Sequence, residues 1–157
     1  MEEQRVLQIY RGLPGSGKTT VARNLPCESD PLPPVIAADD FRNYEKEYDP
    51  KLNKRAHQWC LLETTRYMLR DYPCIRVTNV FHLLAHMTPY IEIAKELEYE
   101  VAVYTVVDTY KKWKNVHSVP EDAIERFRSA WEPYPGELLF HNTSVLLPIA
   151  EDRGCME

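Results

Sequence analysis

The sequence has few features of a secreted, metal-binding or membrane-embedded protein. Its four cysteines, at positions 27, 60, 74 and 155, form no CxxC pair and no other close spacing typical of metal ligands. The longest strongly apolar run, residues 101–107, is far shorter than the roughly 20 residues that a membrane-spanning helix needs. The N-terminal residues lack the basic flank and apolar run of a targeting segment. We therefore expect a cytoplasmic protein with reduced thiols and no membrane role.

The chain also lacks an excess of positive charge. Its 19 basic and 24 acidic residues give a net charge of −5, which argues against tight, non-specific wrapping of nucleic acid. A local basic patch is still able to attract a nucleic-acid substrate. Two groups of cations are candidates for such a patch, with a solvated surface as the alternative for each: Lys51, Lys54 and Arg55, and Lys111, Lys112 and Lys114.

The order of apolar segments predicts a single α/β domain over residues 1–157. Segments typical of strands alternate with segments typical of helices, so we expect an approximately five-stranded parallel sheet with helices on both faces. The predicted strands are residues 5–10, 35–38, 75–78, 101–107 and 143–147. The predicted helices begin at Lys18, at Leu52, at Pro89 after an N-cap at Thr88, and near Pro120. Ligands of such a sheet bind beyond the carboxyl ends of its strands.

Residues 12–19 have the sequence GLPGSGKT and match the phosphate-binding pattern G-x-x-x-x-G-K-[ST]. Its glycines allow the backbone to curl and to direct N–H groups at phosphate oxygens. Lys18 is expected to reach the β- and γ-phosphates of ATP, and Thr19 to offer its hydroxyl to Mg²⁺. The predicted strand before the pattern and the predicted helix after it favour a phosphate site over a chance glycine-rich turn. The predicted nucleotide-binding residues are Gly12, Leu13, Pro14, Gly15, Ser16, Gly17, Lys18, Thr19 and Thr20.

Polar residues follow the other predicted strands. Asp39 and Asp40 come directly after the second strand, which in such a sheet lies beside the phosphate loop. Either carboxylate is a candidate base for an attacking hydroxyl or a candidate Mg²⁺ contact through water, and turn capping is the alternative. Thr19 is expected near the metal together with one of Asp39, Asp40 or Asp108. Asn79 is a candidate for orienting the γ-phosphate or the acceptor, or for capping the following helix.

The segment after the fourth strand, about residues 108–120, is a candidate lid. Cations that close over the phosphates neutralise developing charge and exclude water; solvated loop lysines are the alternative. Its predicted lid lysines are Lys112 and Lys114. Aromatic residues near the second and third strand ends are candidates for stacking on an acceptor base, although aromatics at helical spacing such as Trp59 are more often core. The predicted acceptor-binding residues are Asp40, Tyr44, Asn79 and Phe81.

Four stretches, GLPGSGKTT, ADDFR, the TN at positions 78–79 and VDTYKKW, resemble the polynucleotide-kinase-like P-loop kinases. The resemblance covers most of the chain, to about Trp131. It implies a P-loop NTPase fold with a small helical lid, Asp39 as the base toward the accepting hydroxyl, and Arg42 as a second catalytic residue. It also places His117 among the lid residues, and Thr19 and Asp39 near the metal.

The combination of TNVF with NVHSVPEDAIERFRSAWE is similar to the phage-type branch of this family that includes 5-hydroxymethyluracil DNA kinases. Val77 stands where polynucleotide 5′-kinases usually have Asp, and Ser118 stands where the phage-type branch is expected to have Gly. The resemblance implies a Mg-ATP-dependent kinase whose acceptor is the hydroxymethyl group of hydroxymethyluracil in DNA. The alternatives are a polynucleotide 5′-hydroxyl kinase and an ATP-binding switch that controls a partner protein.

Overall fold

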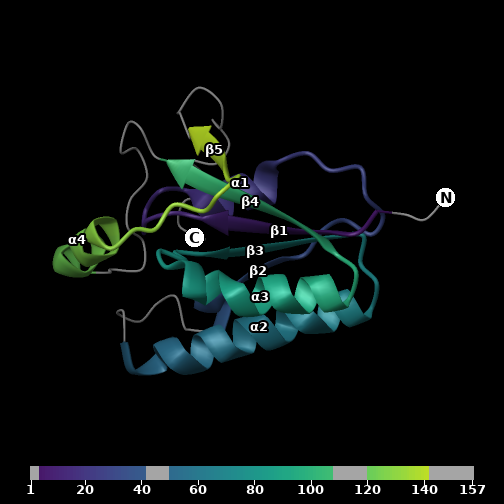
Figure 1. The fold of residues 1–157 in the computed structure, drawn as a ribbon, viewed down its shortest axis with the longest axis horizontal. Helices are drawn as coiled ribbons and strands as arrows, with labels where there is room; N and C mark the ends of the chain where they lie inside the picture. The colour runs from purple at the N-terminus through teal and green to yellow at the C-terminus, as the bar shows by residue number, and fades with distance from the viewer. Residues whose placement is uncertain (1–3, 42–49, 108–119, 142–157) are drawn as a thin grey trace.

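The molecule is a parallel sheet covered by helices on both faces. The structure is a computed structural model that describes residues 4–41, 50–107 and 120–141 (Figure 1). Its strands are β1 Val6–Arg11, β2 Val35–Ala37, β3 Cys74–Asn79, β4 Glu100–Val107 and β5 Leu138–His141. Its helices are α1 Lys18–Asn24, α2 Asn53–Leu69, α3 Leu84–Glu96 and α4 Glu121–Ser129, with 3₁₀ turns η1 Ala38–Phe41 and η2 Pro50–Leu52. The strands run parallel in the order β2-β3-β1-β4-β5, which confirms the predicted sheet.

Strand β1 lies at the centre of the sheet, and its side chains are buried on both faces. Leu7 and Ile9 are fully buried in the core beneath α2 and α3, whereas Tyr10 packs with Val21 and Ala22 of α1 on the opposite face. Successive side chains of a strand point to opposite faces, so a single strand contributes to both cores. The residues that lead into the phosphate loop are therefore held from both sides.

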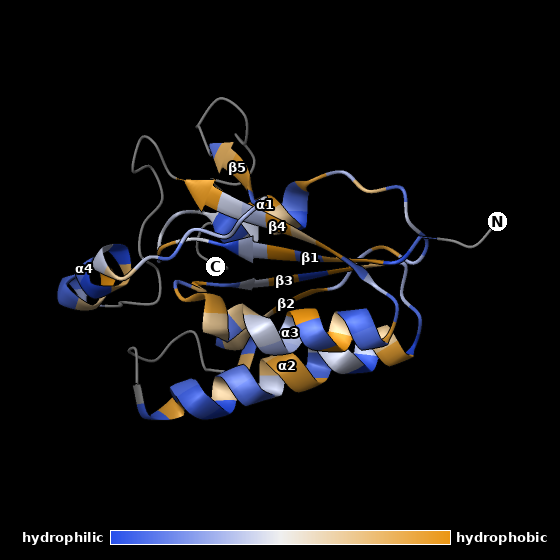
Figure 2. Ribbon diagram, viewed as in Figure 1, coloured by the Kyte–Doolittle hydropathy of each residue, from blue (hydrophilic) through white to orange (hydrophobic). Residues whose placement is uncertain are grey.

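Helices α2 and α3 lie together on one face of the sheet and α1 lies on the other (Figure 1). Arg76 of β3 donates to the carbonyl oxygens of Ala22 (2.7 Å) and Leu25 (3.0 Å) at the end of α1. These bonds satisfy carbonyls that a helix end leaves unpaired, and the positive charge suits that end of the helix. Figure 2 shows hydrophobic residues on α2 and α3 and a mostly hydrophilic α4. Within the described ranges, no helix is long and apolar enough to cross a membrane.

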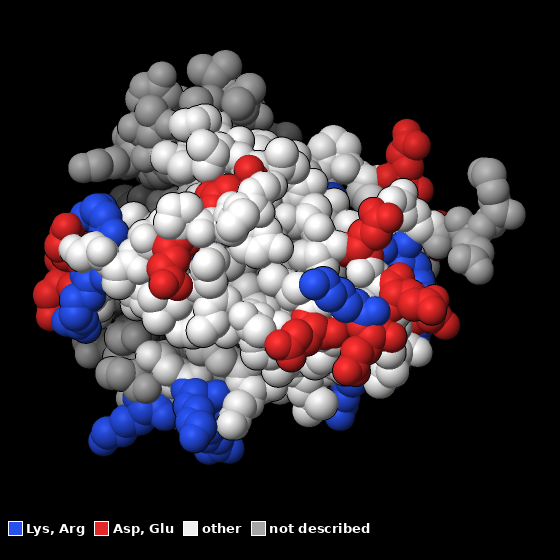
Figure 3. Space-filling model, in the orientation of Figure 1, with Lys and Arg blue, Asp and Glu red and all other residues white. Residues whose placement is uncertain are grey.

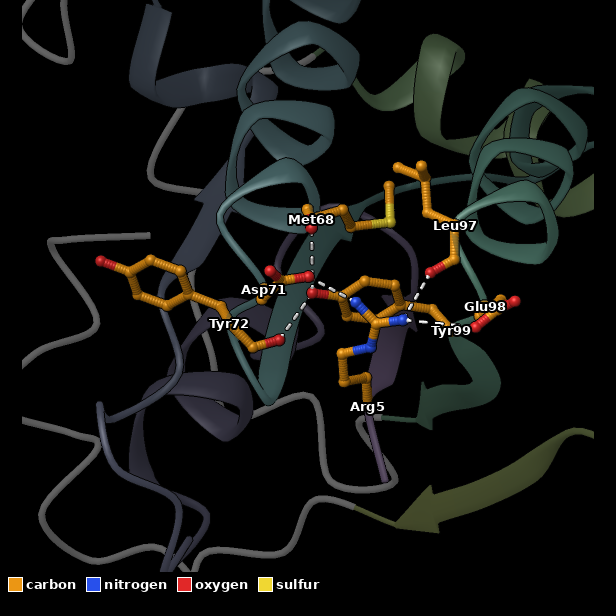
Figure 4. Close-up of polar contacts among 7 residues, drawn as sticks. All are labelled: Arg5, Met68, Asp71, Tyr72, Leu97, Glu98 and Tyr99. Atoms are coloured by element: carbon orange, nitrogen blue, oxygen red, sulfur yellow. Dashed lines mark hydrogen bonds and ion pairs between the residues drawn. The ribbon is translucent and has the colours of Figure 1, made fainter. Parts of the chain in front are cut away.

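The edge of the sheet opposite the carboxyl ends is held by a polar cluster around Arg5 (Figure 4). The Arg5 guanidinium pairs with the carboxylate of Asp71 and donates to the carbonyl oxygen of Leu97 (3.0 Å). Asp71, just after α2, has a positive φ of 59°, a conformation that often ends helices. The Tyr99 hydroxyl donates to the Tyr72 carbonyl oxygen (2.7 Å). Arg5 and Tyr99 thus link the ends of α2 and α3 to the start of β1.

Helix α3 begins at Leu84, so the prediction that Thr88 is its N-cap is wrong. The Thr88 hydroxyl instead donates back to the Leu84 carbonyl oxygen (3.2 Å), and Pro89 lies inside the helix. The free N–H of Leu84 donates to the side-chain carboxylate of Glu132 (2.7 Å). A distant carboxylate therefore satisfies an N-terminal donor of α3, which the local sequence gives no means of predicting.

The edge strand β5 differs from the predicted fifth strand, residues 143–147, which lies outside the described residues. Strand β5 pairs in parallel with β4, with Phe140 opposite Val106. Two of its apolar side chains are exposed in the described structure, Leu138 at 54% and Leu139 at 61%. Successive residues of a strand face opposite sides of the sheet, so these two lie on different faces. The described chain therefore leaves both faces of β5 partly uncovered.

Candidate active site

The connections that follow β1, β2 and β3 meet at one edge of the sheet. All strands are parallel and these three are neighbours in the order β2-β3-β1, so their carboxyl ends lie side by side. The phosphate loop follows β1, the turn η1 with Asp39 follows β2, and Asn79 ends β3. This edge therefore brings together the predicted phosphate loop, carboxylates and amide.

The phosphate loop has a backbone that glycine permits. Gly15 and Gly17 have positive φ values of 82° and 86°, which other residues rarely adopt. The Ser16 N–H donates to the Leu13 carbonyl oxygen (3.0 Å) and closes the turn. A Cβ atom on Gly12 would lie 2.9 Å from the backbone oxygen of Val106, so only glycine fits this close approach to β4. The loop therefore has the curled geometry predicted from the motif.

Lys18 and Thr19 begin α1 directly after this loop, and both are buried. Only 8% of Lys18 is exposed, and no carboxylate in the described parts of the chain forms an ion pair with its ammonium group. A buried cation without an acidic partner is stabilised by binding an anion. The Thr19 and Thr78 hydroxyl oxygens lie 3.2 Å apart, which positions Thr19 against the end of β3.

The two carboxylates after β2 have different surroundings. The Asp40 carboxylate accepts a hydrogen bond from the Ala37 N–H (3.1 Å) and lies 4.0 Å from the Arg23 guanidinium of α1. This is the turn-capping role that the sequence left open for either residue. Asp39 precedes it in the same 3₁₀ turn and is half-buried. The structure therefore assigns turn capping to Asp40 and not to Asp39.

Asn79 holds this turn in place. Its side-chain oxygen accepts a hydrogen bond from the Ala38 N–H (2.9 Å), and its amide nitrogen lies 3.5 Å from the Cys60 sulfur of α2. Burial raises the pKa of the Cys60 thiol to about 11, so this thiol remains protonated near neutral pH. Asn79 therefore connects β3 to the residue preceding Asp39. This arrangement differs from the helix-capping alternative and leaves the proposed acceptor contact a prediction.

Phe81 was predicted to contact the acceptor, but its ring lies in the core. Only 3% of the residue is exposed, and the ring packs edge to face against Tyr90 with centroids 5.3 Å apart. Its backbone has a positive φ of 49°, which is strained for a bulky residue. In this position the ring of Phe81 is not accessible for stacking on an acceptor base, and the residue contributes its backbone carbonyl oxygen as a hydrogen-bond acceptor.

Arg11, which the sequence analysis missed, joins the active-site edge to the segment after α4. Its fully buried guanidinium donates twice to the Phe81 carbonyl oxygen, at 3.0 and 2.6 Å, and once to the Glu132 carbonyl oxygen at 2.7 Å. It lies 4.2 Å from the centre of the Trp131 ring and 3.6 Å from the Glu137 carboxylate. Burial lowers the pKa of Arg11, and the nearby carboxylates oppose that shift. The sequence signal was a charged residue directly between the predicted strand of residues 5–10 and the phosphate loop.

Replacing Arg11 with methionine is expected to destabilise the fold by about 3–5 kcal/mol, since it removes the Arg11 donors from the buried Phe81 carbonyl oxygen and the partly buried Glu132 carbonyl oxygen and leaves a carboxylate without its cation. Urea denaturation followed by circular dichroism measures this loss. Arg66→Met is the matched control, because the Arg66 guanidinium pairs with Glu63 at the surface, where an ion pair contributes less than about 1 kcal/mol. Equal unfolding midpoints for the two variants would contradict the assigned importance of Arg11.

Several predicted residues lie outside the described part of the chain, and their roles stay predictions. They are Arg42, Tyr44, Asp108, Lys112, Lys114 and His117. Among the described residues, no group of three or more His, Cys, Asp or Glu side chains is arranged to hold a metal ion.

Comparison with known proteins identifies a human relative and a common fold. No family model matches the chain. Human NEDD4-binding protein 2 is 28% identical over 149 residues, which are 89% of this chain and 8% of that protein. The chain therefore spans less than a tenth of that relative's length.

Solved structures of similar fold include proteins with ATP or ADP analogues bound. Chaetomium thermophilum Kti12, in complex with ADP-AlF3, has a TM-score of 0.62 at 16% identity, covering 94% of this chain and 96% of Kti12. Mycobacterium tuberculosis APS kinase CysC, with AMPPNP and APS, has a TM-score of 0.59 at 14% identity over 97% and 96%. A chain of the Pnkp1/Rnl/Hen1 RNA repair complex has a TM-score of 0.58 at 18% identity over 83% and 45%. The chain thus has the fold of P-loop kinases.

Proposed function

We propose that this chain is a Mg-ATP-dependent kinase that transfers the γ-phosphate of ATP to a hydroxyl group of a nucleic acid. The observation that carries the proposal is the meeting, at one edge of a P-loop fold, of a curled phosphate loop with a buried lysine and a carboxylate turn held by Asn79. A phosphoryl transfer needs the phosphate loop and the carboxylate turn side by side, because the reaction depends mainly on aligning donor with acceptor and on stabilising charge.

The donor half of the site consists of the loop N–H groups, Lys18 and Thr19. The loop binds the phosphates of ATP, and the buried ammonium of Lys18 supplies the positive charge for the γ-phosphate. The Thr19 hydroxyl and phosphate oxygens would fit Mg²⁺, which prefers few protein ligands and retains waters, and Asp39 would lie near the ion through one of those waters. When bound, this ion neutralises charge that develops on the phosphates.

The acceptor half is organised around Asp39. Asp39 accepts the proton of the incoming hydroxyl as its oxygen attacks the γ-phosphorus, the bond to the β–γ bridging oxygen breaks, and ADP leaves. The Asp40 carboxylate caps its own turn through the Ala37 N–H and lies near Arg23, a structural role that agrees with assigning the base to Asp39, as the family resemblance implies. Asn79 acts as a positioning residue through its bond to Ala38.

The hydroxymethyl group of hydroxymethyluracil in DNA is the acceptor we propose first, on the strength of the TNVF and NVHSVP segments. A base-borne hydroxyl has to leave the stacked duplex, or lie in a single strand, to reach such a site. The 5′-hydroxyl end of a polynucleotide is the second candidate, favoured by the fold that the chain has in common with part of an RNA repair complex.

A panel of acceptors tests the proposal with labelled ATP and the purified protein. The panel contains single-stranded DNA with hydroxymethyluracil and a blocked 5′ end, unmodified DNA and RNA with 5′-hydroxyl ends, and free nucleosides. We expect label in the first; label only in the unmodified strands would assign an end kinase instead. ATP hydrolysis without transfer to any acceptor would contradict the kinase assignment and favour an ATP-dependent switch.

A further inference from the structure

An exposed group of aromatic and basic side chains lies beside Asp39 and has no part in binding ATP in the proposed mechanism. It consists of Phe41 at the end of η1 with Lys54, Arg55 and Trp59 of α2, here called the α2 platform. Phe41 is 37% exposed, a large value for an aromatic side chain in a helical turn. Phe41 follows Asp39 by two residues, so their Cα atoms lie within about 8 Å of each other.

The Phe41 ring of the platform contacts both Trp59 and Arg55. The Phe41 ring lies 6.0 Å from the Trp59 ring, at an interplanar angle of 43°, and 5.9 Å from the Arg55 guanidinium carbon. Arg55 and Trp59 are one helical turn apart and therefore share a face of α2. Trp59 is half-buried, whereas Arg55 and the preceding Lys54 are exposed at the start of α2. The result is an aromatic surface bordered by cations.

The charge of this region points to an anionic ligand. The chain carries a net charge of −5, yet among the described residues Figure 3 shows Lys and Arg side chains gathered where α2 begins and the acidic side chains of this face elsewhere. The first turn of α2 contains no acidic residue, although acidic residues are favoured at that position and cations are disfavoured. An anion bound here would relieve the unfavourable placement of Lys54 and Arg55.

We propose that the α2 platform binds the single-stranded nucleic acid that carries the acceptor hydroxyl. Phe41 stacks on a base, and Lys54 and Arg55 contact backbone phosphates, so that the strand passes beside Asp39. This pairing of aromatic and cationic groups is how single strands are bound without sequence preference. The inference rests on the proposed function for its biological role, but strand binding itself requires neither ATP nor transfer.

The experiment is fluorescence anisotropy of a labelled single-stranded oligothymidylate with the full chain, without ATP, over a series of salt concentrations. We expect Phe41→Ala to weaken binding about tenfold, in line with the loss of one base stack. The double variant K54Q/R55Q should reduce the slope of log Kd against log salt concentration by about 1.4, since each lost phosphate contact contributes about 0.7 for single strands. Arg66→Gln, an exposed cation on the same helix, is the matched control and should change neither quantity.

Phe41→Leu keeps an apolar side chain in the turn and removes only the aromatic face, so it replaces Phe41→Ala if that variant does not fold. Unchanged affinity in Phe41→Leu together with an unchanged salt slope in K54Q/R55Q would overturn the proposal. Displacement of the oligonucleotide by polyglutamate as readily as by an unlabelled strand would also overturn it, in favour of an acidic protein partner. A platform that binds strands while the acceptor panel shows no transfer would refute the kinase proposal alone.

Discussion

Lys18→Ala is expected to reduce ATP turnover about 10²–10³-fold, the range found when one preorganised charge-stabilising donor is removed from an active site. Lys18 is buried next to the phosphate loop and has no carboxylate partner in the described parts of the chain, so its charge is available to a bound phosphate. Steady-state ATP consumption in the presence of the acceptor measures the effect.

The fold should tolerate this change. Removing a buried ammonium group relieves its desolvation cost, so the thermal unfolding midpoint of Lys18→Ala is expected to equal or exceed that of the parent protein. Lys95→Ala, which alters an exposed lysine in the last turn of α3, is the control for charge and should retain full turnover. Full activity in Lys18→Ala with an intact fold would refute the assignment of the phosphate site.

Asp39→Asn is expected to lower the rate of transfer about 10²–10⁴-fold while ATP affinity changes little, because loss of a general base acts on the transition state. The substitution keeps the size of the side chain and removes its ability to take a proton. Single-turnover transfer to the acceptor gives the rate, and titration with a fluorescent ATP analogue gives the affinity. Equal losses of rate and affinity would instead assign Asp39 a role in holding Mg²⁺.

Asp40→Asn is the comparison for this experiment. An asparagine oxygen can still accept the hydrogen bond from the Ala37 N–H, so the turn should remain formed, while the negative charge near Arg23 is lost. We expect less than about a tenfold loss of rate, because a surface charge pair contributes little. Rates that fall equally in the two variants would contradict a single base at Asp39.

Regular segments with a strong local pattern were predictable from the sequence. Strand β1, the glycine-rich loop and α1 follow one another in a stretch where apolar alternation, glycines and a helical pattern are each distinct. The start of α3 was not predictable, because Thr88 and Pro89 form a strong local start signal and the actual N-terminal partner, Glu132, is distant in sequence. A local signal gives way when tertiary contacts satisfy the same backbone groups better.

In the candidate site, too, some features follow from local sequence and others from tertiary contacts. The nucleotide loop and the Asp39–Asp40 pair were found from residue type and spacing, whereas the difference between the two carboxylates depends on which one bonds to the Ala37 N–H. Phe81 was predicted to contact the acceptor, whereas its ring is buried, and the exposed aromatic beside Asp39 is Phe41, which the residue pattern did not single out. Burial of an aromatic in a short loop is decided by the elements that pack around it.

The linear order of residues by itself determined the parallel α/β class and the phosphate loop, because alternation, glycine placement and the Lys-Thr pair act over a few neighbouring residues. Only the tertiary structure decided that Arg11 joins β1 to Phe81 and Glu132, and that Phe41 lies over Arg55 and Trp59. Contacts of this kind join residues that are far apart along the chain. The Arg11 contacts form because folding buries its guanidinium, which must then find its partners within the protein. The Phe41 contacts form because the turn η1 packs against α2.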